Sequence, residues 1–393
     1  LRIRMNMRVR TLFTTYMEND MEKMRMGFAA IGKEWKAYIP EPTVVETRGR
    51  SYCSWGDDNA YPQYLHGLYD DVATLKGIID ATAEYAAGND AEIQMEGFGD
   101  TINSRGDSVR DMIELLAKDY LLYGGFAIQV IRDNIGNIRD LYWMDFKNVR
   151  TDKDGNVIWY SEDFDKKWAR ADKMIQYPRF NRLSKDPSSV LYVKNTFTDV
   201  YPTPRYSGAI RACEIQRAID HFHLASLKNG FAGSYLLNFA NGLPTDKERE
   251  QIEKDITEKF CGADNGGQIL ISYSDGKDNG LTLQRMEISD FGNKYQAASD
   301  RSRQEIFTAF RCIPLLVGLT AESNTGFSTQ EYSDSFKLYN RGVVRPIQMK
   351  IADTFDKIFN TKGALVIEPF SLEDNKEENV DNSQQVDNNI DNI

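Results

Sequence analysis

The side chains that most often bind metals or act as nucleophiles are few in this sequence and far apart. The three histidines are His66, His221 and His223; the last two are two positions apart on a helical pattern, so they cannot share a metal as an i, i+4 pair does. The four cysteines form no CxxC pair: Cys53, Cys213, Cys261 and Cys312. We therefore expect no metal site and no disulfide framework, and we interpret the cysteines as reduced thiols.

Sequence motifs that indicate catalysis are also missing. The chain contains neither the GxSxG turn of α/β-hydrolases nor the GxxxxGK[ST] loop that binds nucleotide phosphates. The adjacent acids Asp57 and Asp58 have the chemistry of metal ligands, but two acids directly after Trp55-Gly56 are more typical of a turn. We predict no catalytic residue, no metal and no cofactor, and so no enzymatic activity.

The composition favours a globular protein and disfavours tight nucleic-acid binding. The chain has 393 residues, 41% of them hydrophobic, which suits roughly two or three domain-sized units. Its 59 acidic and 48 basic residues give a net charge of −11, whereas sequence-specific DNA binding needs many cations. DNA as a passing ligand is not excluded by this charge. No apolar run reaches the 18 residues of a membrane span, and the Arg-rich start lacks the apolar stretch of a signal peptide.

The first half of the sequence carries helix patterns followed by strand patterns. Residues 1–43 are basic and then mixed, and are expected to form a mobile or partner-dependent arm. Apolar spacing predicts a helix over Val72–Ala87, and a second helix begins at Ser108, whose hydroxyl can cap it. Short β-prone runs between Asn, Asp and Gly turns predict antiparallel hairpins: Phe126–Arg132, Ile138–Met144, Val157–Tyr160 and Val190–Val193. Residues 44–205 are thus predicted to be one α+β unit.

In the second half, two long helix patterns flank a small mixed insert. The first pattern, 208–231, is apolar on several faces, so we expect this helix to pack against neighbours on more than one side. The insert, 232–288, has strand patterns and a short helix that Thr245 and Glu248 begin as a capping box. The second pattern covers 289–312. These features predict two antiparallel helices with a protruding α/β module.

The remaining chain is predicted to contain a loop, a long helix and a tail. Residues 319–328 are polar and contain glycine, which favours a loop. A helical pattern then covers 329–359, and Pro346 within it predicts a kink because proline lacks the backbone N–H that the helix needs. Val366 and Ile367 mark a last strand. Residues 371–393 carry seven acids and one Lys, a composition typical of a disordered segment.

The order of two motifs resembles the portal proteins of tailed bacteriophages, the head-to-tail connector family. The stretch Trp55–Pro62 (WGDDNAYP) precedes a helix that ends in Gly88-Asn89, as at the start of those proteins. Later, a helix ends at Arg311 and is followed by Cys312–Gly318 (CIPLLVG), similar to the family's Val-Pro-Pro, Leu-Leu-Gly junction with Ile-Pro-Leu in place of Val-Pro-Pro. The resemblance covers about residues 50–370, and it rests on the order of the motifs more than on any one of them.

The resemblance implies an α+β portal fold and a cyclic ring, with twelve subunits as the family's usual number. By analogy the chain divides into a wing at 44–207, stem helix 1 at 208–231, a small α/β clip at 232–288, stem helix 2 at 289–313, a tunnel loop at 314–328, a long kinked helix with the C-terminal part of the wing at 329–370, and the acidic tail at 371–393. The first stem helix, apolar on several sides, agrees with packing on copies from neighbouring subunits.

The resemblance also implies where DNA and partner proteins contact the ring. The tunnel-loop residues expected to face DNA are Glu322, Ser323, Asn324 and Thr325. Cations on the second stem helix are expected to grip DNA weakly, or alternatively to pair with Asp290, Asp300 and Glu305 between subunits: Lys294, Arg301, Arg303 and Arg311. Partner proteins are expected to dock on the clip through Lys247, Glu248, Arg249, Lys254 and Glu258.

The function implied by the resemblance is a non-enzymatic ring at one capsid vertex, through which double-stranded DNA is packaged and ejected. Its expected partners are the large terminase subunit, then a head-completion or adaptor protein, and the major capsid or scaffold protein, with no membrane. The expected location is the virion, after assembly in the host cytoplasm. Two alternatives are a nucleic-acid-processing enzyme with an unrecognised site and another minor structural head protein.

Overall fold

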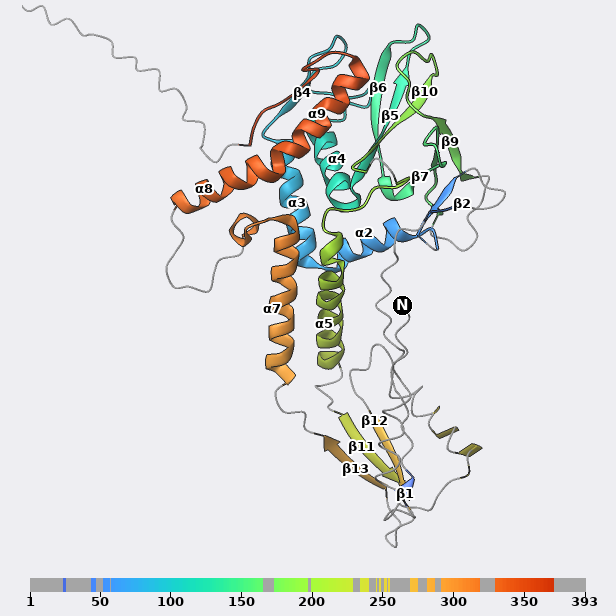
Figure 1. The fold of residues 1–393 in the computed structure, drawn as a ribbon, viewed down its shortest axis with the longest axis vertical. Coiled ribbons are helices and arrows are strands. Elements are labelled where there is room, and N and C mark those ends of the chain that lie inside the picture. The colour runs from blue at the N-terminus through green and yellow to red at the C-terminus, as the bar shows by residue number, and fades with distance from the viewer. Residues whose placement is uncertain are drawn as a thin grey trace, which may run out of the picture. The chain divides into compact units, whose positions relative to one another are not determined.

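The computed structural model describes most of the chain and divides it into two compact units (Figure 1). Unit 1 consists of Leu1–Ile39 and Ala209–Ile306, and unit 2 of Pro40–Gly208 and Phe307–Ile393. The residues described are 24–25, 44–46, 52–56, 58–164, 173–196, 199–228, 234–239, 245, 247–248, 251–252, 254, 269–274, 281–286, 291–318 and 329–370.

Three helices of unit 2 come early in the chain. They are α2 (Tyr61–Asp71), α3 (Ala73–Ala87) and α4 (Val109–Tyr123), and α3 packs against α4. The Ser108 hydroxyl caps α4 by accepting a hydrogen bond from the backbone N–H of Asp111, as the sequence predicted. The helix α4 is capped at its C-terminal end by Gly124, which has a φ of +86°. A Cβ atom at this position would lie 2.5 Å from the carbonyl oxygen of Thr203, so only glycine fits there.

The strands of unit 2 form two three-stranded antiparallel sheets. The first has the order β10-β5-β6, from β5 (Gly125–Arg132), β6 (Ile138–Met144) and β10 (Ser188–Lys194), so β10 is an edge strand. The second joins β7 (Val149–Thr151), β8 (Val157–Tyr160) and β9 (Ile175–Pro178). The four strand runs predicted from the sequence are present, because alternating apolar side chains and Asp-Gly turns specify hairpins locally. The strands β7 and β9 were not predicted.

Two short strand pairs connect distant parts of unit 2. The hairpin of β2 (Val44–Glu46) and β3 (Cys53–Trp55) precedes α2. The strand β14 (Leu365–Ile367) pairs with β4 (Ala91–Ile93), so the C-terminal strand lies beside the segment that follows α3.

The long C-terminal helix continues through its proline by changing its hydrogen-bond spacing. It consists of α8 (Thr329–Tyr339), a π-helical turn at Asn340–Val344 and α9 (Arg345–Phe359), and Pro346 lies in the first turn of α9. A π turn contains one extra residue per turn, which accommodates the missing N–H of the proline without ending the helix. The sequence predicted the position of this irregularity.

Unit 1 contains a helix pair and a mixed sheet. The helices are α5 (Ile210–Lys228) and α7 (Phe291–Phe310, whose last turn belongs to unit 2). The sheet has the order β1-β12-β11-β13, from β1 (Met24–Arg25), β11 (Ser234–Phe239), β12 (Ile269–Ser274) and β13 (Leu281–Met286). The three later strands match sequence patterns, whereas β1, within the predicted arm, was not expected. The predicted disordered tail, 371–393, lies outside the described residues.

Candidate functional site

The helices α5 and α7 contact each other through one face of each. The rings of Phe222 and Tyr295 stack at 4.9 Å, and the Ser299 hydroxyl donates a hydrogen bond of 3.1 Å to the side-chain carbonyl of Gln216. Buried side chains lie on both helices: Ala212, Cys213 and Ile219 on α5, and Ser302 and Ile306 on α7. This pair is the two-helix element that the sequence predicted around the insert.

The helix α5 also exposes two apolar side chains. Ile215 is 45% exposed and Leu224 is 51% exposed. They are nine positions apart, which at 100° per residue places them on opposite sides of the helix. A single chain therefore leaves apolar surface on two sides of α5, in line with the several apolar faces seen in the sequence.

Two of the predicted channel cations contact carboxylates of their own helix. The Arg301 guanidinium lies 2.9 Å from a carboxylate oxygen of Glu305, and Arg303 lies 2.5 Å from Asp300. The pairs are spaced i, i+4 and i, i+3, so the helix itself brings the charges together. The described side chains do not include Lys294, and Asp290 also lies outside the described part. Whether any of these residues faces DNA or a neighbouring subunit stays a prediction.

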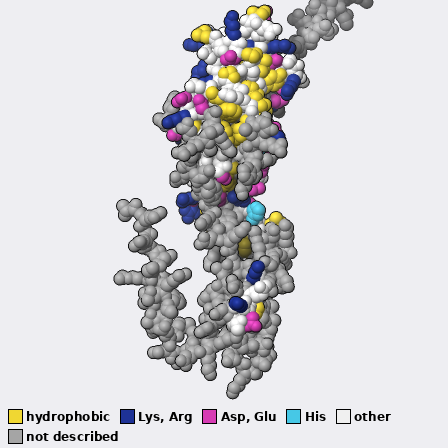
Figure 2. Space-filling view, turned by 90° about the vertical axis from the view of Figure 1, so that its right-hand side faces the viewer, with side chains coloured by type: hydrophobic (Ala, Val, Ile, Leu, Met, Phe, Trp, Pro, Cys, Tyr) yellow, Lys and Arg dark blue, Asp and Glu magenta, His cyan; other side chains and the backbone are white. Residues whose placement is uncertain are grey.

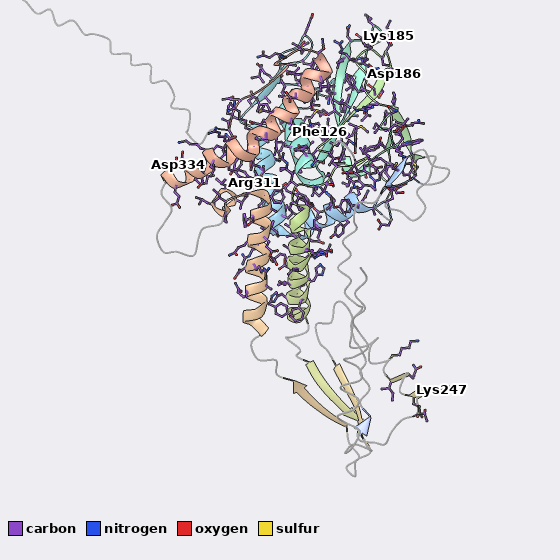
Figure 3. The ribbon with its side chains drawn as sticks, in the orientation of Figure 1. Phe126, Lys185, Asp186, Lys247, Arg311 and Asp334 are labelled. Atoms are coloured by element: carbon purple, nitrogen blue, oxygen red, sulfur yellow. The ribbon has the colours of Figure 1, made fainter. Side chains whose placement is uncertain are left out.

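Arg311 directly follows α7 and precedes the junction motif Cys312–Gly318 (Figure 3). Its backbone has a φ of +53°, and its exposed side chain follows the last helical turn. Pro314 then starts a 3-10 turn, Pro314–Val317, that ends at Gly318 with a φ of +78°. The carbonyl of buried Leu316 accepts a hydrogen bond of 2.8 Å from the Tyr85 hydroxyl, which fastens the junction to α3.

The segment directly after this junction is the predicted tunnel loop. Residues 319–328 lie outside the described part of the chain, and with them the predicted DNA-facing residues Glu322, Ser323, Asn324 and Thr325. The described residues on either side are Gly318, which follows the 3-10 turn, and Thr329, which begins α8. The role of these four residues stays a prediction.

The WGDDNAYP motif is a structural clamp for a buried arginine. Asn59, with a φ of +62°, accepts hydrogen bonds through its side-chain oxygen from the Trp55 N–H at 3.0 Å and from Arg150 Nε at 2.7 Å. Its main-chain carbonyl accepts another from Arg150 Nη2 at 2.5 Å. Asp58 accepts from the Ala60 N–H, as expected of a turn residue, while Asp57 lies outside the described residues. The motif therefore shapes a loop, and its described acid has a turn role.

Arg150 is the residue of this region that the sequence did not predict. Its side chain is fully buried and also donates to the carbonyls of Lys147 and Val149, and its guanidinium lies 5.7 Å from the Trp55 ring centroid. Trp55 in turn stacks on Tyr201 with ring centroids 4.4 Å apart. A buried Arg is costly unless its five donors are satisfied, so the signal in the sequence was the asparagine motif that supplies the acceptors.

Part of the predicted docking surface is visible in unit 1. Thr245 and Glu248 form the predicted capping box: the Glu248 carboxylate accepts from the Thr245 N–H at 3.0 Å, and Glu248 N–H donates to the Thr245 hydroxyl. These hydrogen bonds from Thr245 lower the pKa of the Glu248 carboxyl. Lys247 (Figure 3) and Lys254 are exposed, and Arg249 and Glu258 lie outside the described residues. No observation tests whether a partner binds there.

The histidines and thiols of the described residues have structural surroundings. His66 lies 3.5 Å from Asp70, and burial, followed by the charge of Lys147, lowers its pKa. Burial raises the pKa of the Cys213 thiol to about 12 and that of Cys312 to about 11, which keeps both thiols protonated and unreactive at neutral pH. In the described part of the chain, no group of three or more His, Cys, Asp or Glu is arranged to hold a metal, and no helix has the length and apolar character of a membrane span.

The order of these elements agrees with a family model. Residues 102–378, which include α4, both three-stranded sheets and the whole of unit 1 after Ala209, match the model described as phage portal protein. The chain belongs to the phage portal protein family. The resemblance seen in the two motifs is thereby confirmed.

Curated relatives and solved structures agree with this assignment. A protein of Rickettsia bellii, described as uncharacterized, is 25% identical over 200 residues, 49% of this portal chain and 48% of the relative, and one of Rickettsia felis is 24% identical over 202 residues. The chain spans about half the length of the curated relatives it matches. Among solved structures, the virion of a native gene transfer agent particle has a similar chain (TM-score 0.52, 15% identity, 78% of this chain and 83% of that chain).

A second similar structure is the neck of the same kind of particle. It was computed with C12 symmetry, and its chain has a TM-score of 0.51 and 16% identity, with 78% of this chain and 84% of that chain covered. At these identities the likeness shows the fold alone. The predicted α+β portal fold is therefore confirmed.

Proposed function

We propose that this portal chain is the subunit of a closed ring at one capsid vertex, through which double-stranded DNA enters and leaves the head. Family membership supports the portal role over the two alternatives, an unrecognised enzyme and a different minor head protein. The ring has no catalytic step in this proposal, since the packaging motor is a separate protein. The gene transfer agent neck of similar fold, computed with C12 symmetry, supports twelve copies.

The observation that carries the proposal is the unpartnered apolar surface of α5. Ile215 and Leu224 are about half exposed on opposite sides of the helix in the single chain. A head-to-tail ring gives each subunit two different neighbours, so it covers two opposite sides of the same helix. In unit 2, Leu338 on α8 is 70% exposed and Met349 on α9 is 58% exposed, and Figure 2 shows further hydrophobic side chains at the surface of that unit. A ring provides partners for such surfaces.

The charges of α7 suit a channel that DNA passes quickly. Arg301 and Arg303 each contact an acid of the same helix, so neither presents a full unopposed positive charge to a passing phosphate. The net charge of −11 on each copy adds repulsion along the whole ring. Weak local contacts with little sequence preference let DNA slide, whereas many free cations would hold it in place. We propose that the stem cations and the loop residues 322–325 line this channel.

We further propose that partner proteins dock on the insert between α5 and α7. Its exposed charged residues include Lys247 and Lys254, which lie outside the ion pairs of the described residues. In this proposal the large terminase subunit docks here during packaging and a head-completion or adaptor protein afterwards. The major capsid or scaffold protein is a further partner in this proposal, and the ring is assembled in the host cytoplasm before it becomes part of the virion.

The first experiment measures assembly. Twelve copies of the 44.9 kDa chain have a mass of about 540 kDa, so sedimentation and negative-stain microscopy of the purified protein should show closed rings of that size. Monomers alone over a range of salt concentrations would contradict the proposal.

The tunnel-loop role is tested by deleting residues 319–328, which should leave rings intact and impair DNA packaging or retention. Loss of the rings on that deletion would show that the loop is an assembly element.

A further inference from the structure

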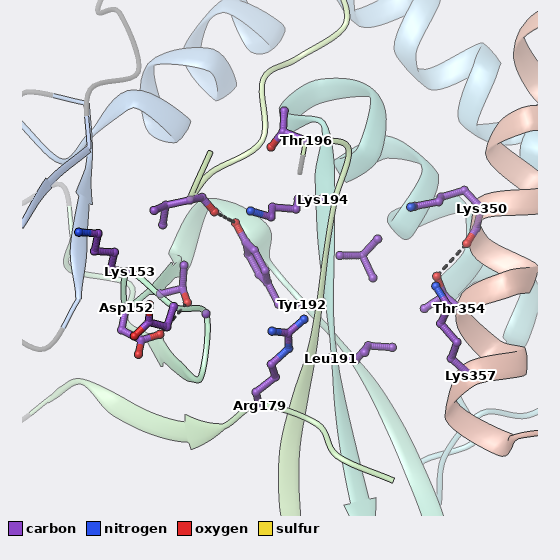
Figure 4. Close-up of a pocket in the computed structure, with 15 residues that line it drawn as sticks. Asp152, Lys153, Arg179, Leu191, Tyr192, Lys194, Thr196, Lys350, Thr354 and Lys357 are labelled. Atoms are coloured by element: carbon purple, nitrogen blue, oxygen red, sulfur yellow. Dashed lines mark hydrogen bonds between the residues drawn. The ribbon is translucent and has the colours of Figure 1, made fainter. Parts of the chain in front are cut away.

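A cationic pocket of about 360 Å³ lies in unit 2 beside the edge strand β10 (Figure 4). Lys350 and Lys357 reach it from α9 on one side of the strand, and Arg179 and Lys153 reach it on the other side. None of these four lies within 4.0 Å of a carboxylate of the described residues. The gathering of unpaired cations in a chain with a net charge of −11 indicates a site for a negatively charged ligand.

The acids of the pocket offset these cations only in part. Asp152 and Asp154 also line it. The Asp152 carboxylate is engaged within its own turn, where one oxygen accepts hydrogen bonds from the N–H groups of Asn156 at 2.7 Å and Val157 at 3.1 Å. Lys194 adds a fifth cation. Burial lowers the pKa of Lys194, the negative charge of Asp199 raises it, and the positive charge of Arg179 lowers it further. The pocket therefore keeps a net positive charge.

The outer edge of β10 offers backbone groups to a ligand in this pocket. The N–H of Arg132 donates to the carbonyl of Pro187, and the N–H of Asn195 donates to the carbonyl of Gly124. The main-chain N–H and C=O groups of the odd-numbered residues of β10 therefore point towards β5. The even-numbered residues face outward, and of these Val190 accepts a bond from the Phe180 N–H. Tyr192 and Lys194 come next along this edge. Their main-chain groups make no outward hydrogen bond to any described residue, so they are open to pairing.

The combination of an open edge with cations on both faces points to a particular kind of ligand. A strand added to the edge directs successive side chains alternately to the two faces of the sheet. Adjacent acids on such a strand would reach Lys350 or Lys357 on one face and Arg179 on the other. The partly buried side chains of Leu191 and Val193 provide apolar contact beside the cations.

We propose that this pocket binds an acidic peptide in extended conformation along the outer edge of β10, and that the peptide is the chain's own segment 371–393. The segment has seven acids and one Lys, with adjacent acids at Glu373-Asp374 and Glu377-Glu378. It also repeats an apolar residue followed by Asp-Asn three times, at 380–382, 386–388 and 390–392. Each repeat supplies an apolar side chain for contact with Leu191 or Val193 and an acid for the cations of the pocket.

The segment 371–393 is long enough to reach the pocket beside β10. A segment of 23 residues spans up to roughly 75 Å when extended, at about 3.3 Å per residue. A compact unit of some two hundred residues has a diameter of roughly 45 Å. The segment that follows Phe370 in unit 2 can therefore reach β10 of its own chain or of a neighbouring copy.

A nucleic acid fits the same pocket less well. The open edge at Tyr192 and Lys194 presents both N–H donors and carbonyl acceptors, and a phosphate backbone has no donor for the carbonyls. The two acids of the pocket, Asp152 and Asp154, also repel a continuous row of phosphates. A peptide satisfies both kinds of backbone group, so the geometry favours it.

The test uses the full chain. In hydrogen–deuterium exchange, peptides from 371–393 and from 188–196 should both be protected in the wild-type protein. The double variant Lys350→Glu/Lys357→Glu should speed exchange in 371–393 by about tenfold or more, since each tenfold change corresponds to about 1.4 kcal/mol. The matched control Lys185→Glu/Arg139→Glu makes the same change in net charge at exposed positions of unit 2 and should leave the exchange unchanged.

Zero-length carbodiimide cross-linking of the same proteins gives an independent readout. Isopeptide bonds should join acids of 371–393 to Lys350 or Lys357 in the wild type and in the control, and mixing chains of two isotopic masses shows whether one chain or two contribute. Wild-type exchange of 371–393 at the rate of an unstructured peptide, or equal exchange in both double variants, would overturn the proposal. So would protection of 188–196 by added duplex DNA that leaves 371–393 exchanging freely.

Discussion

The core of unit 2 and the helix pair of unit 1 differ in whether their groups find partners within a single chain. In unit 2, even a fully buried arginine, Arg150, finds acceptors within its own chain, on Asn59 and on nearby carbonyls. Aromatic rings close over it, with Trp55 stacked on Tyr201. In unit 1, α5 leaves Ile215 and Leu224 about half exposed. Arg150 is paired within a single chain, whereas α5 presents apolar surface that a second chain can cover.

This difference separates folding from assembly. Buried polar groups that are fully satisfied specify one packing and make a region stable by itself. Exposed apolar side chains on two sides of a helix gain little until neighbours remove them from water, at roughly 25 cal/mol per Å² of area buried. We therefore expect substitutions at Arg150 and its contacts in the core of unit 2 to change stability, and substitutions on α5 to change ring formation.

The largest expected effect is on assembly. The double variant Ile215→Glu/Leu224→Glu removes apolar contact and adds charge at both neighbours, and should weaken each subunit contact by about a hundredfold or more. Sedimentation should show loss of rings while the thermal unfolding of unit 2 is unchanged. Leu183→Glu, at an 83% exposed position of unit 2, serves as the control and should keep the rings. Intact rings in the double variant would remove α5 from the interface.

The next largest effect concerns the buried arginine. Arg150→Met keeps most of the side-chain volume but removes one donor from each of three acceptors, the side-chain and main-chain oxygens of Asn59 and the carbonyl of Lys147, so we expect a loss of about 2 kcal/mol in the free energy of unfolding. Thermal or urea unfolding measures it. Arg139→Met is the matched control, because the Arg139 side chain is 67% exposed and its loss should cost little. Equal stability of the two variants would show that the clamp is not needed.

The smallest effect is a pH-dependent gain in unit 2. Asp119 is buried on α4 and accepts a hydrogen bond of 2.7 Å from Trp143 Nε1, and burial, reinforced by Asp145, raises the pKa of its carboxyl well above the usual value. The folded state thus favours the protonated acid and loses stability as the pH rises from the unfolded pKa towards the folded one. Asp119→Asn keeps an acceptor for Trp143 without a charge.

This variant should be more stable than the wild type by about 1 to 2 kcal/mol at neutral pH, with the gain disappearing in acid. Unfolding measured at several pH values gives the result. The exposed Asp334 on α8 (Figure 3) provides the control Asp334→Asn, which should show no such pH-dependent gain. A constant difference across the pH range would mean that folding does not raise the pKa of Asp119.

Local patterns account for the parts of the fold that were predicted. The Ser108 cap, the Thr245–Glu248 capping box and the hairpins of β5, β6 and β8 each depend on residues close together in the sequence. The order of the motifs also identified the portal family before any fold was known. The strands β1 to β4, β7 and β9 escaped prediction. The first five have only two or three residues each, and β9 contains proline.

The tertiary structure decided the matters that depend on contacts between distant residues. The sequence by itself determined the helix pair, the position of the helical irregularity at Pro346 and the family. It did not determine that Asn59 holds Arg150, 91 positions away. Nor did it determine that cations from α9, from the turn between β7 and β8 and from Arg179 after β9 line one pocket beside β10. Charge and periodicity are properties of neighbours in the chain, whereas burial and pairing are set by the packing of elements that the chain brings together only when it folds.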